Sequence, residues 1–323
     1  MRVFVTGGNG FIGSRVVRAL SLHGHAVRLL LRQTSRTARL EGLSYERAEG
    51  DVRDGASLER AMDSCDAVIH LASVSNWNDI QSPLMRTVVV EGTAHVLKAM
   101  RARGIVRAVY ISSATAINGS DRPQVHDERS AYALAGRHFA YAHAKREAEE
   151  LCHGANAAGL SVVIANPAEV YGPGDDDLVT AGNLIDLVRS NPVLACTGGT
   201  SVVHVDDVSE GIVSALERGR ANERYILGGE NLTIRQLAEL SCSLAGVRRR
   251  IIVAPNVLIR GLAALAATLH LPLPFNPAVI PYATRFWFMD AGKATRELGV
   301  RFRSARDVLE PTIAWLRQSG RLG

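Results

Sequence analysis

The stretch TGGNGFIG, residues Thr6 to Gly13, decides the fold that we expect for this chain. Its glycines follow an apolar run and precede a segment with helical spacing, so they lie at a strand-to-helix turn. There Gly7 permits the tight turn, Gly10 lets the backbone approach a pyrophosphate, and Gly13 lets helix and strand pack closely. The helix N-terminus would offer N–H groups to the phosphates. The stretch therefore predicts a dinucleotide site; the alternative is a tight turn with nothing bound.

Strand-like and helix-like segments alternate outward from this turn. Short apolar runs predict strands at Arg2–Thr6, Ala26–Leu31, Ala67–Leu71, Ala108–Ser112 and Ser161–Ala165. Helical spacing of apolar residues predicts helices at Ile12–Leu22, Ser57–Met62, Pro83–Ala102 and Phe139–Ala158. This alternation predicts the α/β class, with a Rossmann-type doubly wound parallel sheet that has helices on both faces.

The pattern changes after Asn166–Pro167, where prolines and glycines interrupt it. We expect a dinucleotide-binding Rossmann domain from residues 1–165 and 200–228. Residues 166–199 and 229–323 are expected to form a smaller, mixed C-terminal substrate-binding domain.

The composition is that of a soluble globular protein, with 47% hydrophobic and 21% charged residues. The net charge of +5 includes one dense cluster, Arg248–Arg250, which is too short to indicate a nucleic-acid site and is interpreted as a solvated loop. The longest apolar stretch, residues 262–275, is too short to span a bilayer. Four widely separated cysteines indicate reduced thiols and no metal site. No leader-like segment precedes the first strand, so we expect a cytoplasmic protein.

The end of the second predicted strand bears on the choice of cofactor. NAD-binding proteins of this kind usually place an acid about 20 residues past the glycines, but no Asp or Glu precedes Glu41 here. Arg32, Ser35 and Arg36 follow the strand instead and suit a 2′-phosphate through charge-assisted hydrogen bonds. The sequence therefore favours NADP(H), with NAD(H) as the alternative.

Two further strand ends are expected to reach the cofactor. Asp51, in GDVRD after a third strand, would lie near the adenine. The run HLAS, His70 to Ser73, ends the fourth strand and would pass beneath the cofactor. His70 itself is equally well explained as a hydrogen-bonded core residue.

Tyr141 and Lys145, in YAHAKREAEEL, are four residues apart on a predicted helix, so both side chains face one side. The chain has 34 arginines and only three lysines, which suggests that an ammonium is needed at position 145. Such a pair is by itself also typical of a solvated helix surface. The serines Ser112 and Ser113, at the end of the fifth predicted strand, favour a catalytic site.

With TGGNGFIG, the motifs GDVRD, HLAS, VEGT, SSAT, YAHAK, NPAEVYGPGD and HVDDV span essentially the whole chain. In these motifs it resembles the extended short-chain dehydrogenase/reductases, the NAD(P)-dependent epimerase/dehydratase family. VRLLLRQTSR, SNWND, ERYILGGENLT and FMDAGKATRELG are most similar to the dihydroflavonol-reductase-like branch, which includes hopanoid-associated sugar epimerases. The resemblance implies a homodimer formed through the predicted helices at 83–102 and 139–158.

The resemblance also implies roles for individual residues. Tyr141 would be the proton donor and acceptor, Lys145 its partner, and Ser113 the hydroxyl that holds the substrate oxygen. A nearby ammonium, together with the oxidised nicotinamide, would favour the phenolate form of Tyr141. Besides Arg32, Ser35, Arg36, Tyr141 and Lys145, the implied cofactor contacts are Gly7, Asn9, Gly10, Phe11, Ile12, Gly13, Asp51, Val52, Leu71, Ala72, Ser73, Ser112, Asn166, Pro167 and Val170. The expected substrate contacts are Trp77, Thr115, Tyr171 and Trp287.

The sequence also bears on the reaction. Dehydratases of the family carry an Asp–Glu pair where Ala114–Ala116 stand here, so dehydration is disfavoured. Thr200–Ser201 replace an Arg–Asp pair common in nucleotide-sugar enzymes, and Val89 replaces a usual asparagine. Apolar segments late in the chain are about equally well explained as core; if part of them lines the cleft with Trp77, the substrate is apolar or aromatic. We therefore expect NADPH-dependent reduction of a ketone or aldehyde on a small molecule. The alternatives are a sugar or sugar-nucleotide epimerase and a non-catalytic NADP(H) sensor.

Overall fold

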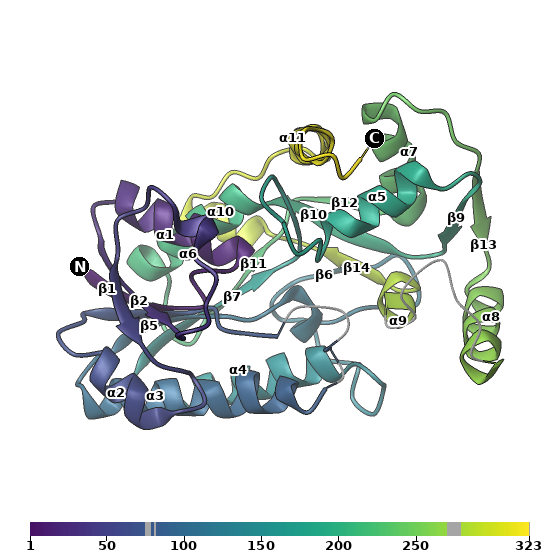
Figure 1. Cartoon of the computed structure of the whole chain (residues 1–323). Coiled ribbons are helices and arrows are strands. Elements are labelled where there is room, and N and C mark those ends of the chain that lie inside the picture. The colour runs from purple at the N-terminus through teal and green to yellow at the C-terminus, as the bar shows by residue number, and fades with distance from the viewer. Residues whose placement is uncertain (75–78, 81, 270–278, 323) are drawn as a thin grey trace.

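The computed structural model describes residues 1–74, 79–80, 82–269 and 279–322, and a seven-stranded parallel sheet is its largest element (Figure 1). The strand order is β11-β7-β5-β4-β1-β2-β3. Their bounds are β1 (Arg2–Thr6), β2 (Ala26–Leu31), β3 (Glu46–Glu49), β4 (Ala67–His70), β5 (Arg107–Ile111), β7 (Ser161–Pro167) and β11 (Arg224–Leu227). The order reverses between β1 and β4, which makes a crevice at the carboxyl ends of these strands. This sheet confirms the predicted fold class.

Helices cover both faces of this sheet (Figure 1). One face carries α1 (Phe11–Leu22), α6 (Val205–Arg218) and α10 (Gly292–Leu298). The other carries α2 (Gly55–Ala61), α3 (Gly92–Ala102) and α4 (Ala140–Ala157). Each layer closes over its own apolar cluster, because parallel strands that are buried on both sides need apolar residues on both faces.

The predicted elements agree with the observed ones except around residues 83–102. There the predicted single helix begins as a π-helical segment, η2 (Arg86–Glu91), and becomes α3 only at Gly92. The segment contains the run Thr87 to Val90, whose β-branched side chains restrict the helical rotamers. Regular α-helix begins only after this run, at Gly92.

A second sheet of five strands stands beside the first. Its order is β12-β10-β14-β6, with β8 paired to β10, and its strands are β6 (Val125–His126), β8 (Glu169–Tyr171), β10 (Gly199–His204), β12 (Glu230–Thr233) and β14 (Phe286–Met289). The chain enters it directly from β7 through Ala168, and it leaves β10 directly into α6. Residues 200–228 thus contribute β10 to the small sheet and β11 to the large one; the division into two domains stays a prediction.

The remaining elements extend the small sheet away from the N-terminus (Figure 1). They are the parallel pair β9 (Val193–Cys196) and β13 (Ile251–Ala254), and the helices α5 (Ala181–Arg189), α7 (Ile234–Leu244), α8 (Asn256–Leu269), α9 (Ile280–Ala283) and α11 (Ala305–Gln318). Among the described residues, no helix combines the length and the apolar character that crossing a membrane requires.

Candidate active site

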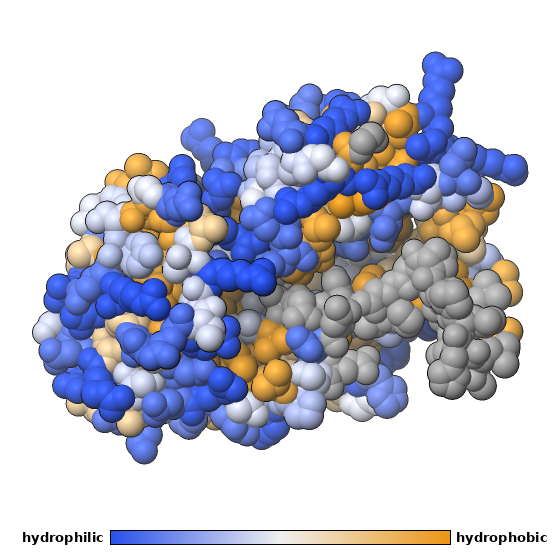
Figure 2. Space-filling view, viewed as in Figure 1, coloured by the Kyte–Doolittle hydropathy of each residue, from blue (hydrophilic) through white to orange (hydrophobic). Residues whose placement is uncertain are grey.

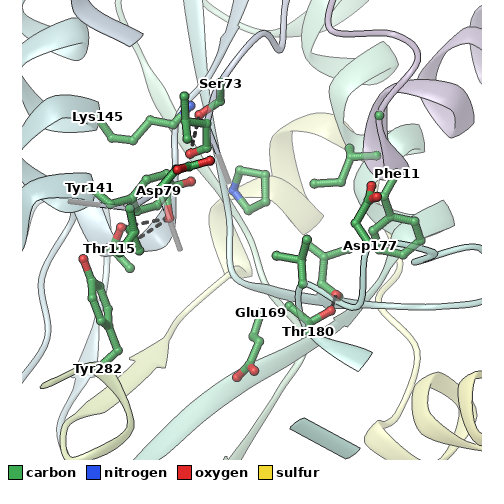
Figure 3. Close-up of a pocket in the computed structure, with 18 of the residues that line it drawn as sticks. Phe11, Ser73, Asp79, Thr115, Tyr141, Lys145, Glu169, Asp177, Thr180 and Tyr282 are labelled. Carbon is green, nitrogen blue, oxygen red and sulfur yellow. Dashed lines mark hydrogen bonds between the residues drawn. The ribbon is translucent and has the colours of Figure 1, made fainter. Parts of the chain in front are cut away.

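A cavity of about 1500 Å³ lies between the carboxyl ends of the large sheet and the elements around the small sheet. It is larger than the roughly 300–1,000 Å³ typical of small-molecule sites. It therefore has room for a dinucleotide and a second molecule together. Figure 3 shows Lys145, Tyr141, Asp79 and Thr115 on one side of it, with Phe11 and Asp177 across from them.

The glycine-rich turn forms the end of the cavity at β1. Gly7 has φ +72°, and a Cβ atom on it would come within 2.7 Å of the Ala72 nitrogen. A Cβ on Gly13 would come within 2.2 Å of the Gly7 oxygen. Gly10 is the N-cap of α1 and no side chain caps that helix, so its first N–H groups are available to a ligand. This cradle fits a pyrophosphate.

The corner beyond β2 carries unpaired positive charge. The Arg32 and Arg36 side chains line the cavity and are exposed, and neither guanidinium forms an ion pair within the described part of the chain. Asn9 connects this corner to the turn, because its Nδ2 donates a 3.2 Å hydrogen bond to the Arg36 carbonyl oxygen. The Ser35 hydroxyl accepts a 3.0 Å bond from the Arg32 N–H. Free guanidinium groups at this position suit a phosphate group.

The residues at the ends of β3 and β4 differ in their access to the cavity. Asp51 lines the cavity and holds the Arg53 guanidinium through both carboxylate oxygens, at 3.0 and 2.7 Å. That pairing lowers the pKa of Asp51. His70 is buried between the hydroxyls of Thr6 and Thr93, at 2.7 and 3.1 Å, and burial lowers its pKa to about 3. His70 is therefore a neutral, hydrogen-bonded core residue.

Ser113 stands where β5 ends and caps the short helical turn that follows. Its Oγ accepts hydrogen bonds from the Thr115 N–H at 3.2 Å and the Thr115 hydroxyl at 3.0 Å. Both bonds use lone pairs of the Ser113 oxygen, so its proton stays available for donation toward the cavity. Thr115 therefore holds the Ser113 hydroxyl as a donor.

Tyr141 and Lys145 lie one turn apart on α4, on the same wall (Figure 3). The Lys145 Nζ is buried, donates a 2.8 Å hydrogen bond to the Ile111 carbonyl oxygen, and lies 5.9 Å from the centre of the Tyr141 ring. Burial lowers the pKa of Lys145 to about 7, although Glu149 opposes the change.

Burial raises the pKa of Tyr141, while hydrogen bonding to Ser113 acts in the opposite direction. The lowering expected from the sequence depends on the oxidised nicotinamide as well as on Lys145, and it stays a prediction.

A buried polar network lies beneath this wall. Glu149 is fully buried, and its Oε1 accepts a 2.6 Å hydrogen bond from the Asn166 Nδ2, which also donates to the Ser113 carbonyl oxygen at 3.0 Å. The Arg224 and Arg146 guanidinium groups lie 3.5 and 3.7 Å from the other Glu149 oxygen. The network joins α4, β5, β7 and β11, so it fixes the strand that carries Ser113 against the helix that carries Tyr141.

The part of the cavity formed by residues 167–287 has a different character. Its described lining includes the acids Glu169, Asp177 and Asp186 but no Lys, Arg or His. Apolar residues predominate, and they include Leu187, Leu194, Ile234, Leu237, Leu258, Ile259 and Ile280. Tyr282 and Trp287 stack with ring centres 5.8 Å apart and close one side. This half suits an uncharged, apolar ligand.

The structure brings most of the predicted site residues to this one cavity. Those that line it are Gly7, Asn9, Gly10, Phe11, Ile12, Gly13, Arg32, Ser35, Arg36, Asp51, Val52, Leu71, Ala72, Ser73, Ser112, Ser113, Thr115, Tyr141, Lys145, Pro167, Val170 and Trp287. Asn166 lies behind the wall in the buried network. Tyr171 is fully buried behind the small sheet, with its hydroxyl donating to Glu169 at 2.7 Å, so Glu169 and not Tyr171 reaches the cavity. Trp77 falls outside the described residues.

The lining residues that sequence reasoning missed include Asp79, Glu169 and Tyr282. Asp79 and Glu169 stand within the quoted stretches SNWND and NPAEVYGPGD, so their carboxylates were visible but could not be assigned to a wall. Tyr282 lies on the short α9 and reaches the site through its packing against Trp287. In the sequence, no regular spacing connects it to Tyr141.

Comparisons with known proteins agree with this geometry. Residues 3–228 match the model of the NAD dependent epimerase/dehydratase family. The chain is 31% identical to a putative dihydroflavonol 4-reductase of Synechocystis sp., over 98% of this chain and 95% of the relative. It is 30% identical to a 4-hydroxy-2-methyl-3-oxo-4-farnesyl-3,4-dihydroquinoline-1-oxide ketoreductase of Stigmatella aurantiaca, over 100% and 98%.

Among solved structures, a nucleoside-diphosphate-sugar epimerase from Pseudomonas aeruginosa is similar with a TM-score of 0.82 and 27% identity, over 100% of this chain and 99% of the other. The matched family model covers the glycine-rich turn, Ser113, Tyr141 and Lys145. The resemblance drawn from the sequence motifs is thereby confirmed, and the chain belongs to the NAD dependent epimerase/dehydratase family, the extended short-chain dehydrogenase/reductases.

Proposed function

We propose that this protein is a carbonyl reductase that uses NADPH to reduce a ketone or aldehyde on an apolar or aromatic small molecule. Family membership and its reductase relatives support NAD(P)-dependent oxidoreductase chemistry. The observation that carries the finer proposal is the shape of one cavity. Its floor is a pyrophosphate cradle, its wall holds Ser113, Tyr141 and Lys145, and its far half is apolar and without a basic side chain among the described lining residues.

Ser113, Tyr141 and Lys145 would each have a different role in the reduction of the carbonyl group. When bound, the reduced nicotinamide supplies the hydride for the carbonyl carbon. The Ser113 hydroxyl, oriented by Thr115, donates a hydrogen bond to the substrate oxygen as negative charge develops there. Tyr141 gives that oxygen its phenolic proton, so the carbonyl becomes an alcohol and the phenol becomes a phenolate. Lys145 stabilises the phenolate and holds the ribose of the cofactor.

The raised pKa of Tyr141 agrees with the reducing direction. At neutral pH the phenol carries its proton before the reaction begins, as a proton donor must. The exposed guanidinium groups of Arg32 and Arg36 support NADPH over NADH, because they would pair with the 2′-phosphate that NADH lacks.

The substrate half of the cavity argues against a nucleotide sugar. A sugar diphosphate needs cationic partners, and the three charged side chains among the described lining residues from 167 to 287 are carboxylates. Leucine and isoleucine side chains supply most of that wall instead. The ketoreductase relative, whose name contains a farnesyl group, supports a substrate of the apolar kind.

The decisive experiment is to purify the protein, identify any cofactor that copurifies by mass spectrometry, and assay a panel of apolar ketones and aldehydes with NADPH and NADH. Turnover that prefers NADPH would support the proposal. Tightly held NAD with interconversion of sugar epimers would overturn it in favour of an epimerase. Binding of NADPH without turnover of any carbonyl, and with no effect of Tyr141→Phe, would indicate a sensor.

A further inference from the structure

The positive charge of the chain is concentrated in one segment. Residues 240–289 contain five arginines and no Lys, Asp or Glu, so this segment carries a formal charge equal to the +5 of the whole chain. Outside it, the basic and acidic residues balance. Three of the five are Arg248–Arg250, in the loop between α7 and β13. Arg248 and Arg250 are exposed, and neither side chain has a hydrogen bond or ion pair within the described part of the chain.

The same segment carries exposed apolar side chains. Val257 is 81% exposed, Leu258 59% and Leu265 55%, all on α8, while Val253 on β13 is 41% and Leu194 on β9 is 62%. Figure 2 shows apolar residues gathered over β9 and β13, with hydrophilic side chains projecting from the loop that precedes β13. Arg250 adjoins this group, because its carbonyl oxygen accepts a 2.9 Å bond from the Val193 N–H beside Leu194. We call these five apolar residues, with Arg248 and Arg250, the apolar-basic patch.

Two residues of the apolar-basic patch also line the cavity. Leu194 and Leu258 belong both to the exposed apolar residues and to the cavity lining. Ala254 and Ile259, their neighbours on β13 and α8, line the cavity as well. Apolar side chains thus extend from the outer surface of the protein into the apolar half of the cavity.

We infer that the apolar-basic patch binds the surface of a membrane that contains anionic phospholipid. Apolar side chains enter the interface while the two free arginines contact the phosphate groups, which is how interfacial elements bind without crossing a bilayer. Residues 240–289 themselves contain no acid that would repel anionic headgroups. With the patch on a membrane, an apolar carbonyl compound would pass from the membrane into the cavity. This passage of substrate rests on the proposed function, whereas membrane binding does not.

The test is flotation of the full-length protein with vesicles, without cofactor or substrate, so that its result does not depend on catalysis. We expect the protein to float with vesicles of mixed phosphatidylcholine and phosphatidylglycerol, and to float far less with phosphatidylcholine alone or at high salt. Val257→Glu is expected to weaken binding about tenfold or more, and so is the double variant R248E/R250E. The matched controls are Leu22→Glu, at an apolar residue that is 77% exposed on α1, and Arg129→Glu, at a side chain that is 92% exposed.

Circular dichroism melting curves would establish that all four variants fold. Equal vesicle binding by wild type, Val257→Glu and R248E/R250E would overturn the inference, and so would binding that ignores lipid charge. A patch that instead joins two copies of the chain would give no flotation and a dimer that Val257→Glu dissociates in analytical ultracentrifugation. That outcome would also overturn it. Each of these results leaves the carbonyl-reductase proposal to its own assay.

Discussion

The Nζ of Lys145 donates a 2.8 Å hydrogen bond to the carbonyl oxygen of Ile111. This contact ties α4, which carries Tyr141, to the end of β5, two residues before Ser113. It therefore fixes the distance between the two hydroxyl groups proposed to share a substrate oxygen. An arginine has no compact, rotatable donor to place there, which favours a lysine at this position in a chain with 34 arginines and three lysines.

Replacing Tyr141 by Phe removes the proposed proton donor and leaves the ring in place. We expect kcat to fall about 10²- to 10⁴-fold while the Kd for NADPH stays within a few-fold of wild type. Tyr132→Phe, at a phenol that is hydrogen-bonded to His143, is the matched control and should leave kcat unchanged. Equal activity of Tyr141→Phe and wild type would exclude the proposed role.

Replacing both Arg32 and Arg36 by Ala removes the two free guanidinium groups near the turn. The KM for NADPH should rise about tenfold or more, because the 2′-phosphate loses its contacts with the two arginines. The KM for NADH should change little, because NADH has no 2′-phosphate. The comparison of the two coenzymes is itself the internal control. Arg235→Ala, at an ion-paired surface residue of α7, should affect neither. A parallel loss with both coenzymes would show that the arginines do not select NADPH.

Replacing Lys145 by Met tests the cost of the buried ammonium. The pKa of Lys145 is about 7 in the folded chain and 10.5 in the unfolded one, so the unfolded chain binds more protons between these values. The free energy of unfolding of wild type, relative to Lys145→Met, should therefore be lowest below pH 7. It should rise by up to about 1.4 kcal/mol per pH unit as the pH increases from there. Urea denaturation from about pH 6 to about pH 9 measures it, with Lys98→Met as the exposed control.

Replacing Glu149 by Gln tests the buried network. Glu149 favours the ammonium form of Lys145, so the neutral amide should lower the pKa of Lys145 further. If the ammonium is the active form, the basic limb of the kcat/KM profile should move to lower pH. Glu147→Gln, at an exposed residue of the same helix that pairs with Arg86, should leave the profile in place. A loss of stability without any shift of the profile would show that Glu149 is structural only.

Two glycines with similar φ angles allow the cost of a left-handed backbone to be measured separately from the cost of a clash with neighbouring atoms. Gly7 and Gly24 have φ +72° and +75°, but only Gly7 has backbone atoms within 3 Å of the Cβ that alanine would add. Gly24→Ala should cost about 1–2 kcal/mol of unfolding free energy, which is the left-handed penalty alone. Gly7→Ala should cost clearly more and weaken NADPH binding. Equal losses in urea denaturation and cofactor titration would contradict the proposed cradle.

Much of the cofactor half was predictable because its signals are local. The glycine-rich turn, the strand end at Arg32 and the four-residue spacing of Tyr141 and Lys145 each lie within one element or one turn. Parallel strands then bring their carboxyl ends to one edge, so local patterns also predict which side chains share a cavity.

The substrate half was less predictable because its contacts join distant segments. Trp287 and Tyr282 face the site through their stacking. Glu169 and Tyr171 lie on the same face of β8, where the Tyr171 hydroxyl donates to the Glu169 carboxylate, and only the packing around the small sheet decides that Glu169 lines the cavity while Tyr171 is buried. The hydrogen-bonded pair of Glu149 and Asn166 could not be predicted from the sequence, because its two members are 17 residues apart and lie on different elements.

The short connection at Ala168 bears on how far the two halves of the cavity can move relative to one another. Strands β7 and β8 are almost one continuous ribbon, and β10 runs without a break into α6, so two stiff connections link the halves that enclose the cavity. We expect connections this short to leave the two halves little freedom to open apart. If the two halves do not open, we expect substrate and product to exchange beside Leu194 and Leu258, which are exposed and also line the cavity, and we expect this exchange to limit turnover.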